Sequence, residues 1–128
     1  MVGLPGSGKT TFCKKFLPNH VRICLDEIEN NDRDKEFEMI EENLSKGNNI
    51  VVDDTSITKY IRAGHVLRAR KFNATIKAVF FNYSIAKIRI QNSERKDQVP
   101  DSALFKMRKQ LVPPTKDEGF EFVQEVND

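Results

Sequence analysis

The sequence lacks tryptophan and contains only two cysteines, Cys13 and Cys24, among 128 residues. These positions fit neither a Cys-x-x-Cys motif nor a zinc-ligand spacing, so we expect free buried thiols rather than disulfides. No apolar run approaches the roughly 20 residues of a membrane span. The N-terminus is also rich in glycine where a signal peptide would be apolar. These absences exclude a disulfide-stapled secreted domain and predict a cytoplasmic protein that is neither secreted nor anchored to a membrane.

Internal repeats, low-complexity tracts and linkers rich in Gly, Pro or Ser are absent as well. With 38% apolar and 31% charged residues, the composition is typical of one soluble globular domain. A chain of this length buries roughly two thirds of the surface that its unfolded form exposes. We therefore expect one domain over residues 1–128 that folds without covalent staples.

Acidic residues are missing between Asp54 and Glu94, although the net charge of the chain is only +2. Residues 26–54 carry eleven Asp or Glu, whereas residues 55–111 carry thirteen Lys or Arg. A basic segment could hold a polyanionic ligand, but solvated helix faces give the same pattern. The aromatic interleaving of a nucleic-acid stacking surface is absent. The basic residues between the two acids are Lys59, Arg62, Arg68, Arg70, Lys71, Lys77, Lys87 and Arg89.

Short apolar runs alternate with segments of helical periodicity along the chain. Strands that alternate with helices indicate a parallel sheet in an α/β fold. We expect strands at 21–25, 50–52, 75–81 and 120–126, and helices at 9–17, 32–46, 58–73, 84–96 and 101–112.

Residues 3–10, Gly-Leu-Pro-Gly-Ser-Gly-Lys-Thr, match G-x-x-x-x-G-K-[ST] at every fixed position. Its glycines let consecutive N–H groups turn inward around a phosphate, and the following helix points its positive end there. The Lys9 side chain would neutralise the β- and γ-phosphates, while the Thr10 hydroxyl would ligate Mg²⁺. A glycine-rich turn can be purely structural, but the complete motif favours ATP and Mg²⁺ as cofactors. The expected nucleotide contacts are Gly3, Pro5, Gly6, Ser7, Gly8, Lys9, Thr10 and Thr11.

Two acidic residues, Asp53 and Asp54, end the apolar strand expected at 50–52. A magnesium site beside the phosphates needs a carboxylate at the carboxyl end of a strand. We expect Asp54 to be this ligand, since it precedes Thr55 and Ser56 at the mouth of the strand. Strand alternation keeps Asp53 as the alternative, and loop capping is the structural explanation for either residue.

The order of motifs resembles that of the P-loop polynucleotide 5′-hydroxyl kinase family, small ATP-binding kinases of AAA type. The resemblance covers nearly the whole chain, although only the P-loop is specific by itself. It implies an α/β P-loop NTPase-type fold of three layers, with a mostly parallel sheet, helices on both faces and a helical lid at about 84–111. The residues that carry it are G-x-P-G-S-G-K-T, Asp26, Asp54-Thr55-Ser56, Asn92-Ser93-Glu94-Arg95 before Val99-Pro100, and Pro113-Pro114 before Glu118-Gly119-Phe120.

The resemblance implies ATP-dependent transfer of the γ-phosphoryl group to a hydroxyl, with Lys9, Asp26 and Arg95 as catalytic residues. Asp26 takes the position of the general base, which accepts the proton of the hydroxyl. A helix N-cap is the structural explanation for this residue. Arg95 matches the lid arginine that contacts the β- or γ-phosphate, with Arg89 as the alternative. A solvated basic helix face would explain both arginines equally well.

One departure concerns the acceptor. The family pattern Asp-x-x-Arg places a phosphate-binding arginine where this chain has Glu29, and the next expected helix is rich in acidic residues. Such a surface repels a nucleic-acid backbone, so the acceptor stays open between a nucleic-acid 5′ end and a small hydroxylated molecule. A small-metabolite kinase and a non-catalytic ATP-binding module that acts through a partner are the alternative functions.

Only Met1 and Val2 precede Gly3, where such folds place an apolar strand of about five residues. In the resembling family this strand lies beside the strands expected here at 50–52 and 75–81. Its absence predicts unpaired backbone groups and a gap in the core. We therefore expect a truncated chain or a gene model that starts too late.

Overall fold

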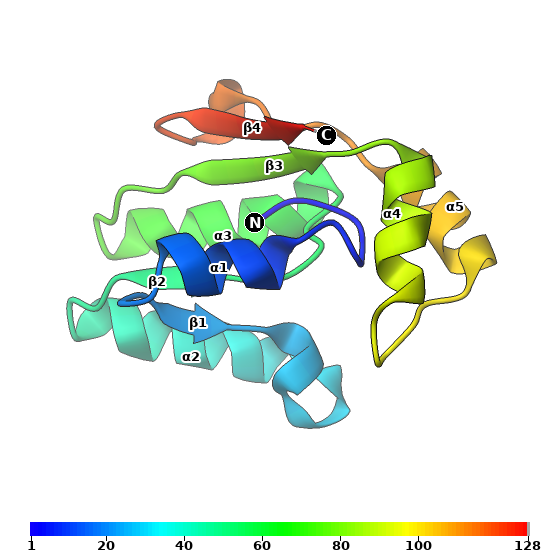
Figure 1. Cartoon of the computed structure of the whole chain (residues 1–128). Coiled ribbons are helices and arrows are strands. Elements are labelled where there is room, and N and C mark those ends of the chain that lie inside the picture. Colours follow the sequence, from blue (N-terminus) through cyan, green and yellow to red (C-terminus); the bar gives the residue numbers. More distant parts are fainter. Residues whose placement is uncertain (128) are drawn as a thin grey trace.

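Short parallel strands form the middle layer of the protein, which a computed structural model describes over residues 1–127 (Figure 1). β1 pairs with β2 with Val21 opposite Ile50, and β3 pairs with β4 with Ala78 opposite Val123. Both pairs are parallel, as the alternation of strands and helices predicts. The strands are β1 (Val21–Ile23), β2 (Ile50–Val52), β3 (Ala78–Asn82) and β4 (Val123–Asn127).

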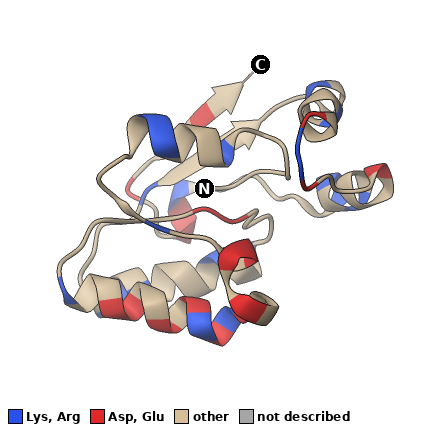
Figure 2. Cartoon of the chain, turned by 60° about the horizontal axis from the view of Figure 1, so that its bottom comes forward, with Lys and Arg blue, Asp and Glu red and all other residues tan. Residues whose placement is uncertain are grey.

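Helices cover both faces of this strand layer. Helix α1 lies on one face, helices α2 and α3 lie on the other, and α4 and α5 lie beyond the carboxyl end of β3 (Figure 1, Figure 2). This arrangement confirms the expected α/β fold of P-loop NTPase type. The helices are α1 (Lys9–Phe16), α2 (Arg33–Ser45), α3 (Lys59–Lys71), α4 (Ile85–Ser93) and α5 (Asp101–Gln110), and the 3₁₀ turns are η1 (Leu25–Glu27), η2 (Glu29–Asn31) and η3 (Lys116–Glu118).

Side-chain caps fix where three of the helices begin. The Asp32 carboxylate accepts hydrogen bonds from the N–H groups of Asp34 and Lys35 at the start of α2. The Thr58 hydroxyl accepts one from Ile61 in α3, and Ser84 caps α4 in the same way. Because such caps satisfy backbone donors that a helix cannot pair internally, these starts follow from the local sequence.

The expected helix at 84–96 ends earlier, at Ser93. The Asn92 side chain donates to the Val99 carbonyl at 2.7 Å and accepts from the Val99 N–H at 3.0 Å. This buried amide stabilises the turn between α4 and α5. The sequence predicts Asp101 as the N-cap of the next helix, but Pro100 takes that position and Asp101 is the first helical residue.

The last expected strand begins later than predicted, at Val123 instead of Phe120. Phe120 is buried in a cluster with Val66 of α3 and Ala78 of β3. Phe120 was included in the predicted strand because it is apolar. A side chain packed in the core outside a strand gives the same hydropathy signal as a buried strand residue.

Residues Met1–Gly3 lie between β2 and β3 and connect the two strand pairs. The Val2 N–H donates to the Val79 carbonyl, and the Phe81 N–H donates to the Val2 carbonyl, each at 2.8 Å. On the other side, the Met1 ammonium donates to the Val52 carbonyl at 3.0 Å, and burial lowers its pKa. A cavity of about 1020 Å³, lined by residues of both β2 and β3, extends from Met1.

The expected buried thiols are confirmed within residues 1–127. Cys13 and Cys24 are both free and buried. None of the described helices has the length and apolar character needed to cross a lipid bilayer.

Candidate functional site

The loop before α1 has the backbone geometry of an anion-binding loop. Gly6 has a φ of 83° and Gly8 a φ of 93°, both in the left-handed region that favours glycine. A Cβ atom on Gly6 would also lie only 3.1 Å from the backbone nitrogen of Asn92 in α4. The loop leads directly into α1 at Lys9. The unpaired N–H groups at this helix start can therefore bind a phosphate.

The Lys9 side chain folds back over this loop. Its ammonium donates to the carbonyls of Gly3 at 3.1 Å and Leu4 at 2.8 Å. Burial lowers the pKa of Lys9 to about 8, although the nearby Asp53 carboxylate acts in the opposite direction. A phosphate bound at the loop would add negative charge beside the buried ammonium of Lys9 and so favour its charged form.

The Thr10 hydroxyl lies beside Asp53, to which it donates a hydrogen bond of 2.7 Å. The same carboxylate oxygen accepts from Arg22 of β1 at 2.7 Å, and Arg22 also donates to Glu27 at 2.8 Å. A hydroxyl and a carboxylate at the carboxyl end of a strand are hard oxygen ligands of the kind that Mg²⁺ prefers. Thr10 and Asp53 therefore fit a magnesium ion.

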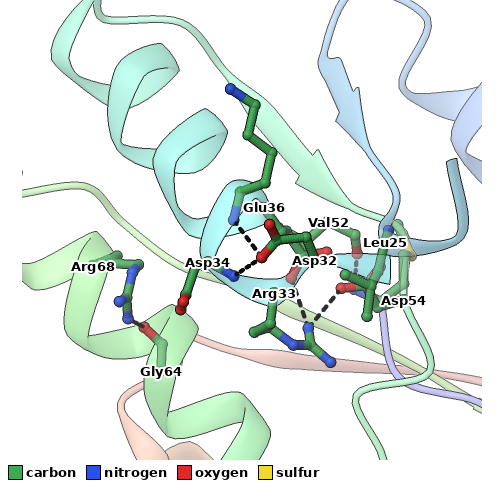
Figure 3. Close-up of polar contacts among 11 residues, drawn as sticks. Leu25, Asp32, Arg33, Asp34, Glu36, Val52, Asp54, Gly64 and Arg68 are labelled. Atoms are coloured by element: carbon green, nitrogen blue, oxygen red, sulfur yellow. Dashed lines mark hydrogen bonds and ion pairs between the residues drawn. The ribbon is translucent and has the colours of Figure 1, made fainter. Parts of the chain in front are cut away.

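Asp54 faces a different set of residues (Figure 3). Its Oδ1 accepts from the Leu25 N–H at 2.9 Å, and its Oδ2 accepts from Arg33 of α2 at 3.3 Å. Sequence reasoning preferred Asp54 as the magnesium ligand and kept Asp53 as the alternative, whereas the structure brings Asp53 to the Thr10 hydroxyl. Alternation along a strand turns neighbouring side chains in opposite directions, which the sequence alone cannot orient.

One cavity of about 360 Å³ brings residues from distant parts of the sequence together. Asp26 reaches it from η1, and Arg95 reaches it from the segment after α4. Two residues of the loop, Gly3 and Ser7, are buried and are not part of the lining. The lining residues are Pro5, Gly6, Gly8, Lys9, Thr10, Thr11, Cys24, Asp26, Asp53, Asp54, Thr55, Gln91, Glu94 and Arg95.

Four of these lining residues, Cys24, Thr55, Gln91 and Glu94, were not among the predicted site residues. Neither their residue types nor their spacing belongs to a recognisable phosphate-binding pattern, and only the folding of α4 toward the loop brings the last two there. Arg22, which holds Asp53, was missed for the same reason, because its partner is 31 positions away.

The alternative lid arginine, Arg89, makes an ion pair of 2.9 Å with Asp101 of α5 and does not line the cavity. The structure therefore brings Arg95, and not Arg89, to the cavity beside the glycine loop.

Many of the basic residues between Asp54 and Glu94 contact other residues of the same chain. Arg62 is paired with Glu118, Lys71 with Glu41, and Arg89 with Asp101. The Arg68 guanidinium lies 3.4 Å from the centre of the Phe37 ring. Charges that are already paired attract a polyanion weakly, so this segment offers less to a nucleic-acid backbone than its sequence indicates.

Comparison with known families adds one finding. The model of a family described as "AAA domain" matches residues 1–114 of the chain. The match starts ahead of the glycine loop and ends after α5, so it contains every residue that lines the 360 Å³ cavity.

Proposed function

The chain belongs to the AAA domain family, and we propose that it is a P-loop phosphotransferase. The family match over residues 1–114 supports a P-loop kinase-like type. The proposed enzyme transfers the γ-phosphoryl group of ATP to a hydroxyl acceptor. The observation that carries the proposal is that Lys9, Asp26 and Arg95 line the same 360 Å³ cavity at the glycine loop. A cation, a carboxylate and a lid arginine around a phosphate-binding loop are the groups that phosphoryl transfer needs.

The loop would bind the β- and γ-phosphates through its N–H groups, with Lys9 neutralising their charge. Thr10 and Asp53 would hold Mg²⁺, which supplies charge neutralisation at the phosphates. The proposed nucleotide contacts also include Thr11, which lines the cavity. Arg22 acts as a positioning residue, because its hydrogen bond orients the Asp53 carboxylate.

In the transfer itself, the acceptor oxygen forms a bond to the γ-phosphorus while the bond from that phosphorus to the bridging oxygen of ADP breaks. Asp26 accepts the proton that the acceptor hydroxyl loses. Arg95 stabilises the charge on the transferring group. Asp26 is exposed at the cavity mouth, where an acceptor can approach it.

The charges around Asp26 favour a small hydroxylated acceptor over the backbone of a nucleic acid. Glu29 is exposed in η2, and acidic residues gather on the turns and on α2 that follow (Figure 2). Repulsion of a polyphosphate backbone by this surface would weaken its binding. The resemblance to polynucleotide kinases makes a 5′-hydroxyl end the competing acceptor, and a small-metabolite kinase of the same fold satisfies the same geometry.

Incubation with γ-labelled ATP and Mg²⁺ tests the proposal, with a 5′-hydroxyl oligonucleotide in one reaction and a pool of hydroxylated metabolites in another. Label that moves to an acceptor, and is lost in Lys9→Ala but kept in Lys14→Ala, supports the phosphotransferase. Lys14 is an exposed lysine of the same helix and serves as the matched control. Retention of ATP without transfer to any acceptor would indicate a non-catalytic ATP-binding module.

A further inference from the structure

Three buried side chains with metal-ligating groups meet between α2, α3 and the end of β2. They are Glu36, Asp54 and His65, and one ligand atom of each lies within 4.8 Å of the others. The three residues come from separate elements, so tertiary packing alone brings them together. Within residues 1–127, none of the three makes a hydrogen bond to Thr10 or Lys9.

Several polar atoms of this cluster are buried without a hydrogen-bond partner. His65 is 9% exposed, and both its ring nitrogens are unpartnered. Glu36 is fully buried, and its Oε2 atom is unpartnered as well. Buried polar atoms in native proteins are nearly always paired, and each exception calls for an explanation such as an ion. The Phe37 ring, 5.9 Å from the His65 ring, offers the imidazole only an aromatic contact.

The cluster holds two carboxyl groups beside one cation. A single guanidinium, that of Arg33, contacts both Glu36 at 2.6 Å and Asp54 at 3.3 Å (Figure 3). Burial, together with the neighbouring Asp54, raises the pKa of Glu36 to about 8, so this carboxyl group is protonated at pH 7 and would release its proton on binding a cation. Burial lowers the pKa of His65 to about 4. The imidazole is therefore neutral at pH 7, which is the form that binds metals.

We propose that Glu36, Asp54 and His65 form a binding site for a divalent transition cation of the zinc class, separate from the magnesium position at Thr10 and Asp53. One imidazole nitrogen and two carboxylate oxygens are a ligand set that suits Zn²⁺ or Co²⁺, whereas Mg²⁺ favours oxygen ligands alone. These ions bind such ligands at about 2.0–2.2 Å, so ligand atoms that lie up to 4.8 Å apart would move closer together to bind one ion. His65 also lines the 1020 Å³ cavity, through which water can reach the imidazole.

A bound ion would join α2 and α3 to the end of β2. Asp54 also lines the 360 Å³ cavity, so the same ion would fix one wall of the nucleotide site. The first expected consequence of ion binding is a more stable fold, because a ligand that binds only the folded state raises the free energy of unfolding.

Co²⁺ is the probe for this site, because its visible absorption reports the ligand set, and Zn²⁺ is then used to displace it. The full chain is titrated in excess Mg²⁺, which occupies the other position. We expect one Co²⁺ per chain, displacement by Zn²⁺, and a melting temperature that Zn²⁺ raises and a chelator lowers again. Glu36→Gln and His65→Ala should each weaken the binding by about tenfold or more.

His20→Ala is the matched control, since it removes the other histidine of the chain and should leave the binding unchanged. Glu36→Gln keeps the size of the side chain, and circular dichroism verifies that each variant folds. Absence of Co²⁺ binding to the wild type overturns the site. Binding that survives both Glu36→Gln and His65→Ala, or that His20→Ala abolishes, overturns it equally.

Discussion

The Arg62 side chain of α3 makes a two-pronged ion pair with Glu118 of η3, across 56 positions of sequence. Its Nε donates to one carboxylate oxygen at 2.8 Å and its Nη2 to the other at 3.1 Å. Arg62 is 2% exposed and also donates to the Ser56 carbonyl. The pair therefore fastens the segment after α5 to the body of the fold.

Glu118→Ala should destabilise the protein, because it leaves the buried Arg62 guanidinium without its carboxylate. The free energy of unfolding should fall by about 3 kcal/mol, as is typical when one partner of a buried ion pair is removed. Urea denaturation followed by circular dichroism measures this change. Glu121→Ala, at an exposed neighbouring position, is the control and should have little effect. Equal stability of the two variants would contradict the role of the pair.

Lys9→Ala and Thr10→Ala should each weaken Mg·ATP binding while the domain stays folded. Both substitutions remove ligand contacts at the loop and little core volume. Calorimetric titration with ATP and Mg²⁺ measures the affinity, with Lys14→Ala as the control. Unchanged affinity in both variants would contradict the phosphate-binding assignment of the loop.

Asp26→Asn should keep ATP binding and lower kcat by roughly 10² or more, the size expected when a general base is lost. Arg95→Ala should also lower kcat, because the transferring group loses a stabilising charge. Asp34→Asn, at an exposed position of α2, provides the control. If Asp26→Asn turns over at the wild-type rate, Asp26 has a structural role and another group accepts the proton.

Glu29→Arg should improve the use of oligonucleotide acceptors, because it replaces a repelling charge near Asp26 by an attracting one. The ratio of kcat/KM for an oligonucleotide to that for a small polyol measures the effect. Efficient phosphorylation of oligonucleotides by the wild type, with little change in Glu29→Arg, would show that the acidic turns lie away from the acceptor.

The Cys13 thiol should react slowly with alkylating reagents in the folded protein. Burial raises its pKa to about 11, and the thiolate is the reactive form. Below this pH, the rate should rise about tenfold with each pH unit, since the thiolate fraction does so. Mass spectrometry after timed alkylation follows the rate, with the urea-unfolded chain as the reference. Rapid modification of the folded protein at pH 7 would contradict the burial of this thiol.

The sequence by itself determined the glycine loop, the helix that follows it and the α/β fold. Local rules were enough for these features: positive φ at Gly6 and Gly8 needs glycine, and the caps at Asp32 and Thr58 bond only to neighbours in the chain. The apolar run at Ile50–Val52 likewise predicted a buried parallel strand, because such strands need no polar face.

Only the tertiary structure decided which aspartate faces Thr10 and which arginine faces the cavity. Asp53 and Asp54 are adjacent in sequence, and the packing of β2 between Arg22 on one side and α2 on the other gives them different partners. The cluster of Glu36, Asp54 and His65 could not be predicted from the sequence either, because no spacing rule connects residues on separate elements. Contacts over long sequence distances depend on how helices pack against the sheet, and local propensity does not encode that packing.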